Sequence, residues 1–151
     1  MANENKQKME YDDIKLSTRT VLIGLWTALL FLYIYCDIFT FFRPNQIHEI
    51  TEGFMGPFPV NQVSLLAAGL LLALPALMIV ANLFIKLVAI KWINIIAGIV
   101  YTLVNIGNII GEKWAYYIVY AVIEILITVL ITVKSIKWPR KTGRLSNDHN
   151  S

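Results

Sequence analysis

Four long apolar runs dominate the chain, and most charged residues fall between them. A helix rises about 1.5 Å per residue, so about 20 apolar residues cross the roughly 30 Å hydrocarbon core of a bilayer. A soluble four-helix bundle would need a polar stripe on every helix, and the second run, VSLLAAGLLLALPALMIVANLFI, has almost none. We therefore predict an all-α fold, an up-and-down bundle of four transmembrane helices at residues 21–42, 63–85, 92–110 and 114–133.

The connections between these runs are short, with one exception. We assign residues 1–20 to an amino-terminal segment, 43–62 to a loop and 134–151 to a basic tail. Prolines and glycines interrupt the loop, and its IHEITEGFM stretch is short and amphipathic enough to lie along a membrane interface or to form a lid. We interpret it as a connection.

Pro75 lies near the centre of the second run. Proline has no backbone N–H, so we predict a helix kink at this position. The kink leaves the carbonyl of Leu71 without its helical partner. Within a membrane this oxygen needs a donor from the protein or from water.

The basic residues predict the orientation of the chain in the membrane. All but two of the 13 Lys and Arg residues lie in the amino-terminal segment, in the connection 86–91 or in the tail; the exceptions are Arg43 and Lys113. Because cytoplasmic connections carry the excess of Lys and Arg, both termini are predicted to be cytoplasmic and the 43–62 loop to lie outside. This topology accounts for the net charge of +3, and nothing else indicates nucleic-acid binding.

Polar residues inside the runs follow helical spacing. Those of the third run are four, three, four, three and four residues apart, which places them on one helical face. Because asparagines and acids are unfavourable in lipid, we predict that such stripes face the bundle interior. The stripes are Asn94, Gly98, Tyr101, Asn105, Asn108 and Glu112 in the third run, Tyr117, Tyr120, Glu124, Thr128 and Ser135 in the fourth, and Tyr33, Asp37 and Thr40 in the first.

Counting residues from the predicted outer interface places several of these polar residues in two layers. The first layer, about 9 Å deep, contains Asp37, Asn105 and Tyr120; the second, about 15 Å deep, contains Tyr33, Tyr101 and Glu124. With Asn108, these are our candidate binding or transport residues. Asn82 and Asn94, nearer the cytoplasmic side, are predicted to pack and hydrogen-bond between helices.

The two acids are the most informative members of this set. No run contains a Lys, Arg or His that could pair with Glu124, so desolvation favours its neutral form, whereas Asp37 is nearer water. Two carboxyls in different environments suit passage of protons or cations, or recognition of a small polar or cationic ligand. The alternative is that these groups only hold helices together, at about 0.6 kcal/mol for each hydrogen bond.

Other chemistries have little support. Cys36 is the only cysteine, so no internal disulfide or thiolate metal cluster can form. His48 and His149 lie outside the runs, which argues against a pair of haem ligands in the bilayer. No Gly-x-Ser-x-Gly, His-Glu-x-x-His or other catalytic signature is present. We expect no enzymatic activity, no cofactor and no metal site.

Several stretches resemble one family of small bacterial four-helix membrane proteins of unknown function. They are YIYCDIFTFFRP, EGFMG, PALMIV and WINIIAGIVYTLVNIGNIIGE, within a likeness that covers most of residues 12–133. The resemblance implies a multi-pass protein of the bacterial cytoplasmic (inner) membrane, loosely similar in architecture to DoxX-like proteins. It implies no activity and assigns no role to Asp37 or to the asparagines.

Two functions are consistent with these observations. In the first, Asp37 and Glu124 form a polar site, open to the outer face, for transport or binding of a proton, a cation or a small polar ligand. In the second, the chain is a non-catalytic accessory or assembly subunit whose stripes pack against a membrane-protein partner or against further copies of itself.

Overall fold

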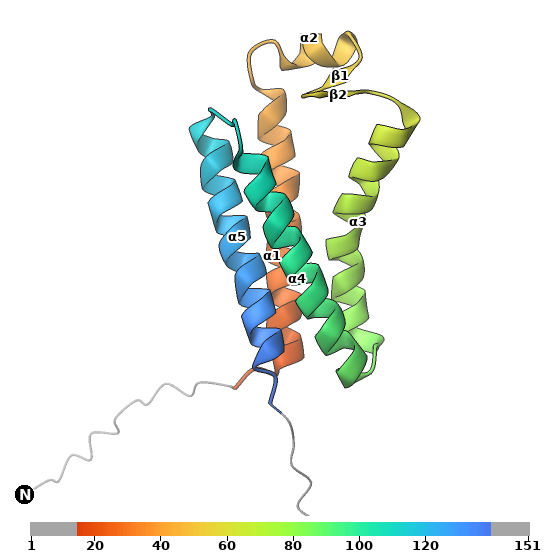
Figure 1. Cartoon of the computed structure of the whole chain (residues 1–151), viewed down its shortest axis with the longest axis vertical. Helices are drawn as coiled ribbons and strands as arrows, with labels where there is room; N and C mark the ends of the chain where they lie inside the picture. Colours follow the sequence, from red (N-terminus) through yellow and green to blue (C-terminus); the bar gives the residue numbers. More distant parts are fainter. Residues whose placement is uncertain (1–14, 140–151) are drawn as a thin grey trace, which may run out of the picture.

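The computed structural model describes residues 15–139, which form five helices and one short hairpin (Figure 1). Four of the helices are long and apolar enough to cross a membrane, which confirms the predicted fold class. A small helix and the hairpin connect the first two of them. The elements are α1 (Thr18–Phe41), α2 (Gln46–Thr51), β1 (Phe54–Met55), β2 (Phe58–Pro59), α3 (Gln62–Phe84), α4 (Leu87–Ile109) and α5 (Ala115–Ile136).

The helices that contain the third and fourth predicted spans extend beyond the apolar runs. Helix α4 begins at Leu87, not at residue 92, and therefore contains Lys91. A lysine is tolerated there because its long side chain reaches the helix end, where Nζ donates to the carbonyl of Ile136 at 3.1 Å. Helix α5 continues to Ile136 rather than ending at residue 133. Residues 1–14 and 140–151 of the predicted terminal segments lie outside the described residues.

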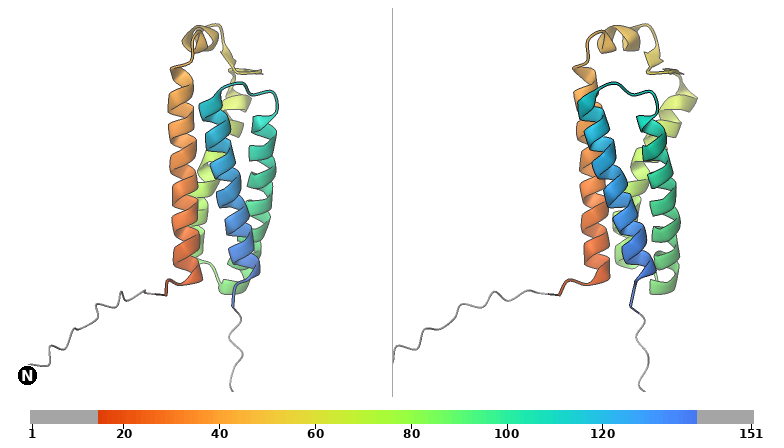
Figure 2. Two further views of the ribbon diagram at one scale, coloured as in Figure 1. Left: turned by 90° about the vertical axis from the view of Figure 1, so that its left-hand side faces the viewer. Right: turned by 60° about the vertical axis from the view of Figure 1, so that its left-hand side comes forward.

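The four long helices run alternately up and down, and α1 begins at the same end of the bundle at which α5 finishes (Figures 1 and 2). Helix α1 packs against α3 and α5, and α4 packs chiefly against α5. We call the end that carries α2 and the hairpin the loop end, and the opposite end the terminal end. At the loop end, α3 leans away from α4 (Figure 1).

A network of hydrogen bonds joins Trp26, Asn82 and Asn94 at the terminal end, where the buried Ser135 Oγ has no partner within residues 15–139. Trp26 Nε1 donates to Asn94 Oδ1 at 2.7 Å, and the amide groups of Asn82 and Asn94 bond reciprocally at 2.9 and 3.2 Å. Arg19 donates to the last carbonyls of α3, including that of Ile85 at 2.7 Å, where a cation is favourable. Asn82 and Asn94 therefore pack between helices as predicted.

Pro75 lies inside α3, and the carbonyl of Leu71 is indeed partnered from outside that helix. Tyr101 Oη on α4 donates to it at 2.5 Å. The Tyr101 side chain is only 1% exposed and packs edge-on against Trp26, with ring centroids 5.8 Å apart. This hydrogen bond links α3 to α4, which separate towards the loop end (Figure 1).

Removing the Tyr101 hydroxyl should therefore destabilise the protein more when Pro75 is present than when it is replaced by Ala. Tyr101→Phe is expected to cost about 1 kcal/mol in lipid because the Leu71 carbonyl loses its donor. In a Pro75→Ala background the new backbone N–H can bond to Leu71, so the same change should cost much less. Reversible unfolding of the four proteins of this cycle measures both costs, and equal costs in the two backgrounds would contradict the pairing.

Candidate functional site

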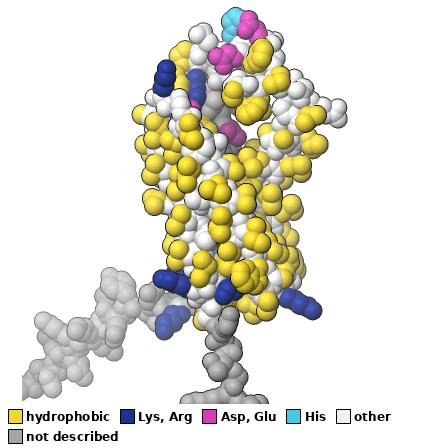
Figure 3. Space-filling view, viewed as in Figure 1, with side chains coloured by type: hydrophobic (Ala, Val, Ile, Leu, Met, Phe, Trp, Pro, Cys, Tyr) yellow, Lys and Arg dark blue, Asp and Glu magenta, His cyan; other side chains and the backbone are white. Residues whose placement is uncertain are grey.

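A cavity of about 570 Å³ lies at the loop end among α1, α3, α4 and α5. The space-filling view shows a hollow on the side of the molecule where α3 and α4 separate, with an acidic side chain inside it (Figure 3). The predicted candidates that line this cavity are Tyr33, Asp37, Asn105, Asn108 and Glu124. Residues from three helices, chosen from depth and spacing alone, thus share one cavity.

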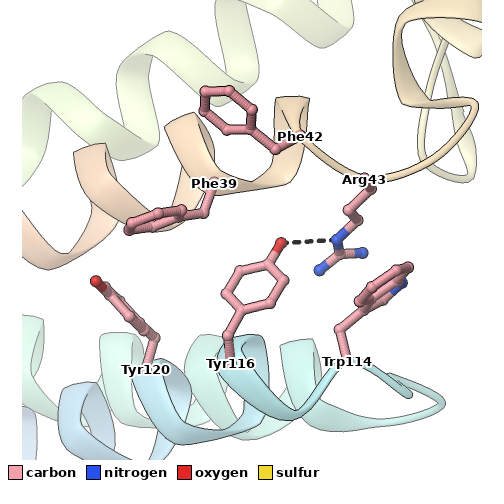
Figure 4. Close-up of a pocket in the computed structure, with 6 residues that line it drawn as sticks. All are labelled: Phe39, Phe42, Arg43, Trp114, Tyr116 and Tyr120. Atoms are coloured by element: carbon pink, nitrogen blue, oxygen red, sulfur yellow. Dashed lines mark hydrogen bonds between the residues drawn. The ribbon is translucent and has the colours of Figure 1, made fainter.

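Two predicted candidates lie elsewhere. Tyr101 is buried against Trp26 and does not line the cavity, but it contacts two lining residues: it bonds to the Leu71 carbonyl, and its ring centroid lies 6.2 Å from that of Tyr33. Tyr120 is turned about 60° around the axis of α5 from Tyr117. It faces Phe39 at a centroid distance of 6.3 Å (Figure 4). Tyr117 takes the position beside the cavity that we expected for Tyr120.

Two buried polar atoms of the lining have no partner within residues 15–139. They are Asn105 Nδ2 and Glu124 Oε1, and the two side chains are 0% and 4% exposed. Tyr33 Oη donates to the oxygen of the Asn105 amide at 2.9 Å, so only the amide nitrogen remains free. At the terminal end, by contrast, Asn94 Nδ2 donates both to Asn82 and to the Ile90 carbonyl.

Asp37 is exposed at the cavity rather than buried beneath it. The ion pairs found in residues 15–139 are Arg43–Glu112 and His48–Glu52, so neither cavity acid is paired with a cation. None of the lining residues that the structure describes is Lys, Arg or His. Groups of three or more His, Cys, Asp or Glu side chains suited to a metal ion are also absent from this part of the chain.

The loop between α1 and α3 covers the loop end of the cavity. Gln46 and Ile50 of α2, Met55 of β1 and Val60 all contribute to the lining. The hairpin is held by the bond from Val60 N to the Gly53 carbonyl at 2.7 Å. Interpreting this segment as a plain connection was therefore incomplete, because sequence patterns do not show what a loop folds over.

Beside the cavity, Arg43 joins α1 to the α4–α5 turn through an aromatic cluster (Figure 4). Its Nε donates to Tyr116 Oη at 2.7 Å and its Nη2 to Glu112 Oε2 at 3.1 Å. The guanidinium also stacks 5.1 Å from the ring centre of Tyr117. Arg43 is thus engaged outside the cavity lining, and Tyr117 separates its cluster from the cavity.

The carboxylate of Glu112 stabilises the α4–α5 turn in its ionised form. Burial alone would raise the pKa of Glu112, but the backbone N–H groups of Trp114 and Lys113 and the Arg43 guanidinium donate to its carboxylate. These bonds outweigh burial, so the pKa lies below the usual value. The charged form therefore holds the α4–α5 turn against α1.

The Arg43–Glu112 pair should make stability fall in acid. Because the pKa of Glu112 is lower in the folded state, its contribution is complete above the ordinary glutamate range, about 4.3, and disappears as pH falls through the lowered value. Unfolding temperatures between pH 7 and pH 3 should fall less steeply for Glu112→Gln than for the wild type. Glu52→Gln, in an exposed pair, is the control and should follow the wild type; equal slopes for Glu112→Gln and the wild type would contradict the prediction.

Four packed helices, each able to span a bilayer, define a multi-pass integral membrane protein. The chain belongs to DUF6326, a family of unknown function whose profile matches residues 8–144. This match confirms the family resemblance predicted from the sequence. No curated protein and no solved structure matches the chain.

Sequence reasoning missed part of the lining. Cys36 and Ala121 line the cavity but do not belong to the polar stripes from which the candidates were chosen. Cys36 is next to Asp37, and Ala121 lies between Tyr117 and Glu124 on α5. The wall contributed by α3 is apolar, and this helix has no polar side chain between Ser64 and Asn82, so no polar pattern indicates which of its residues line a cavity. Tyr117 belongs to the predicted stripe of the fourth run but was not among the candidates, although it lies seven residues, about two helical turns, from Glu124.

Proposed function

We propose that this protein binds a small cationic or polar ligand in the cavity between its helices, with Asp37 and Glu124 as the charge-recognising groups. Asn105 and Tyr33 supply further hydrogen bonds, and Asn108 lies at the side of the cavity. By the distribution of Lys and Arg, the loop end faces outward and both termini are cytoplasmic, in a bacterial inner membrane.

The observation that carries the proposal is that two buried polar atoms without a partner in the described part of the chain belong to residues that line one cavity, whereas the third such atom, Ser135 Oγ, lies away from it at the terminal end. Asn94 has every amide group partnered, whereas Asn105 and Glu124, equally buried, each keep a free polar atom beside a cavity. Buried polar groups are usually hydrogen-bonded, and an unsatisfied one costs about 1 to 3 kcal/mol. A ligand that bonds to them would remove this cost.

The cavity volume also fits a small molecule. Ligand sites typically occupy about 300 to 1,000 Å³ and combine apolar walls with a few convergent polar groups. The 570 Å³ cavity has this composition, with acids and amides from α1, α4 and α5 opposite leucines of α3.

Cys36 offers a direct test because it is the only cysteine and lines the cavity. In lipid nanodiscs, a cationic methanethiosulfonate reagent should modify Cys36 about tenfold faster than an anionic one, because two acids attract cations. The preference should disappear in Asp37→Asn/Glu124→Gln and persist in the control Glu49→Gln, which alters an exposed acid outside the lining. An inert Cys36, or a preference independent of the two acids, would contradict the proposal.

Flux measurements decide whether binding leads to transport. If the site carries its ligand across the membrane, proteoliposomes should show proton, cation or polar-solute flux that Glu124→Gln abolishes. Flux that is equal in both proteins would remove Glu124 from any transport path.

The accessory-subunit function keeps one observation in its favour. Asn108 and Asp37 are exposed on the side where α3 and α4 separate, and a partner helix could cover them. Gentle purification with crosslinking should then recover a partner in fixed ratio. Recovery of monomers or of copies of this chain alone would count against that function.

A further inference from the structure

The cavity has two chemically different walls. Its polar wall consists of Asp37, Asn105 and Glu124, with the rings of Tyr33 and Tyr117 beside them. Its apolar wall comes from α3 and includes Leu65, Ala68 and Leu72. A ligand that fills the space must therefore present a polar group to one side and hydrocarbon to the other.

The cavity is covered at the loop end and hollowed at the side. Residues of α2, β1 and Val60 lie over the loop end, whereas the hollow in Figure 3 faces outward where α3 leans away from α4. Leu65 on α3 is 52% exposed there, and Asn108 on α4 is also exposed. In a spanning helix bundle this side faces lipid, so a ligand dissolved in the bilayer reaches the cavity without crossing the loop.

Charge restricts the polar group of the ligand. The lining contains two acids and, among its described residues, no basic side chain. Arg43 stacks on Tyr117 but is already paired with Glu112. A ligand with a negative headgroup would bring like charges together, whereas an ammonium group would meet carboxylates and the faces of tyrosine rings.

We infer that the ligand is an amphipathic organic cation, an ammonium group attached to a hydrocarbon chain or ring, which enters from the membrane between α3 and α4. This inference rests on the proposed function and specifies its ligand class. The ammonium group lies between the carboxyl groups of Asp37 and Glu124 and leaves its hydrocarbon against Leu65, Ala68 and Leu72. A bare metal ion would leave most of the 570 Å³ unfilled.

Protection of Cys36 from the neutral reagent N-ethylmaleimide tests this ligand class in nanodiscs. Four probes separate charge from hydrocarbon: decyltrimethylammonium, tetramethylammonium, decanoate and decanol. The first should slow modification about tenfold at concentrations where the other three have little effect. Its chain concentrates it in the bilayer, by about 0.8 kcal/mol for each methylene group, and only it combines a chain with a positive charge.

Two variants test which part of the ligand each wall of the cavity binds. Asp37→Asn/Glu124→Gln leaves partition into lipid unchanged but removes the charge, so protection by decyltrimethylammonium should disappear. Ala68→Trp fills the apolar wall and should reduce protection by decyltrimethylammonium while Cys36 stays reactive towards N-ethylmaleimide.

The outcomes separate this inference from the proposed function. Equal protection by tetramethylammonium and decyltrimethylammonium would overturn the amphipathic ligand and the route through lipid but keep a cation site. Protection by decanoate or decanol, unaffected by the acid substitutions, would overturn the cationic headgroup. No protection by any probe, with Cys36 reactive and selective for cationic reagents, would overturn the ligand class alone. A Cys36 that no reagent modifies would overturn both proposals.

Discussion

Replacing Glu124 by Leu is expected to stabilise the protein in lipid by about 1 to 3 kcal/mol while weakening the charge-dependent reactivity of Cys36. Glu124 is 4% exposed and its Oε1 has no partner within residues 15–139, so the carboxyl is costly to bury. Leu has a similar volume and no polar group. Reversible unfolding in mixed micelles or bicelles measures the change in the free energy of unfolding.

Asn94→Leu is the matched comparison. Asn94 is also buried, but its amide is bonded to Trp26, Asn82 and the Ile90 carbonyl. Its removal leaves these partners unsatisfied and should destabilise the protein by about 1 to 3 kcal/mol. If Glu124→Leu instead destabilised the protein as Asn94→Leu does, Glu124 would be a structural residue, and the binding proposal would lose its main support.

Gly98→Ala should destabilise the protein by about 1 to 3 kcal/mol, because overpacking at a helix contact forces the backbones apart. A Cβ at Gly98 would clash with Thr132 Oγ1 of α5 and lie 3.2 Å from the Thr128 carbonyl oxygen. The same region carries the bonds from Thr102 Oγ1 to Thr128 Oγ1 and from Thr132 Oγ1 to the Thr128 carbonyl. Small residues allow such close helix approach in membranes.

Gly69→Ala provides the control for Gly98→Ala. A Cβ at Gly69 of α3 meets nothing within 4 Å, and alanine is the better helix former by about 1 kcal/mol. This variant should be neutral or slightly stabilising in the same unfolding assay. Thr132→Ala should rescue only part of the loss in Gly98→Ala, since the Thr128 backbone remains. An unchanged stability for Gly98→Ala would show that α4 and α5 do not pack as closely as the structure indicates.

The helices were predictable because a bilayer imposes both length and composition on any helix that crosses it. The ends of the helices were less predictable than the apolar runs: Lys91 lies inside α4 and reaches the carbonyl of Ile136. The loop was harder, since α2 and the hairpin cover the cavity through tertiary contacts of Ile50, Met55 and Val60 that leave no periodic pattern.

The candidate site was predictable to the extent that polar residues in a membrane must face inward. Asp37, Asn105 and Glu124 come from different helices, and the inward-facing stripes together with depth counting put them in neighbouring layers; all three line the cavity. Tyr120 packs against Phe39 and Tyr117 lines the cavity, because depth does not specify rotation about the helix axis. The apolar wall of α3 could not be predicted, because no polar residue distinguishes the side of Leu72 from the sides that face lipid.

Infrared spectroscopy of the lipid-reconstituted protein tests the central claim most directly, namely that Glu124 faces an accessible cavity rather than a sealed helix contact. Glu124→Gln and Asp37→Asn assign the carboxyl bands. We predict that the Glu124 band changes reversibly with pH in the folded protein and shifts when an alkyltrimethylammonium ion is added. A Glu124 band that responds neither to pH nor to this cation, while the Asp37 band does, would contradict the account and leave Glu124 as a structural residue.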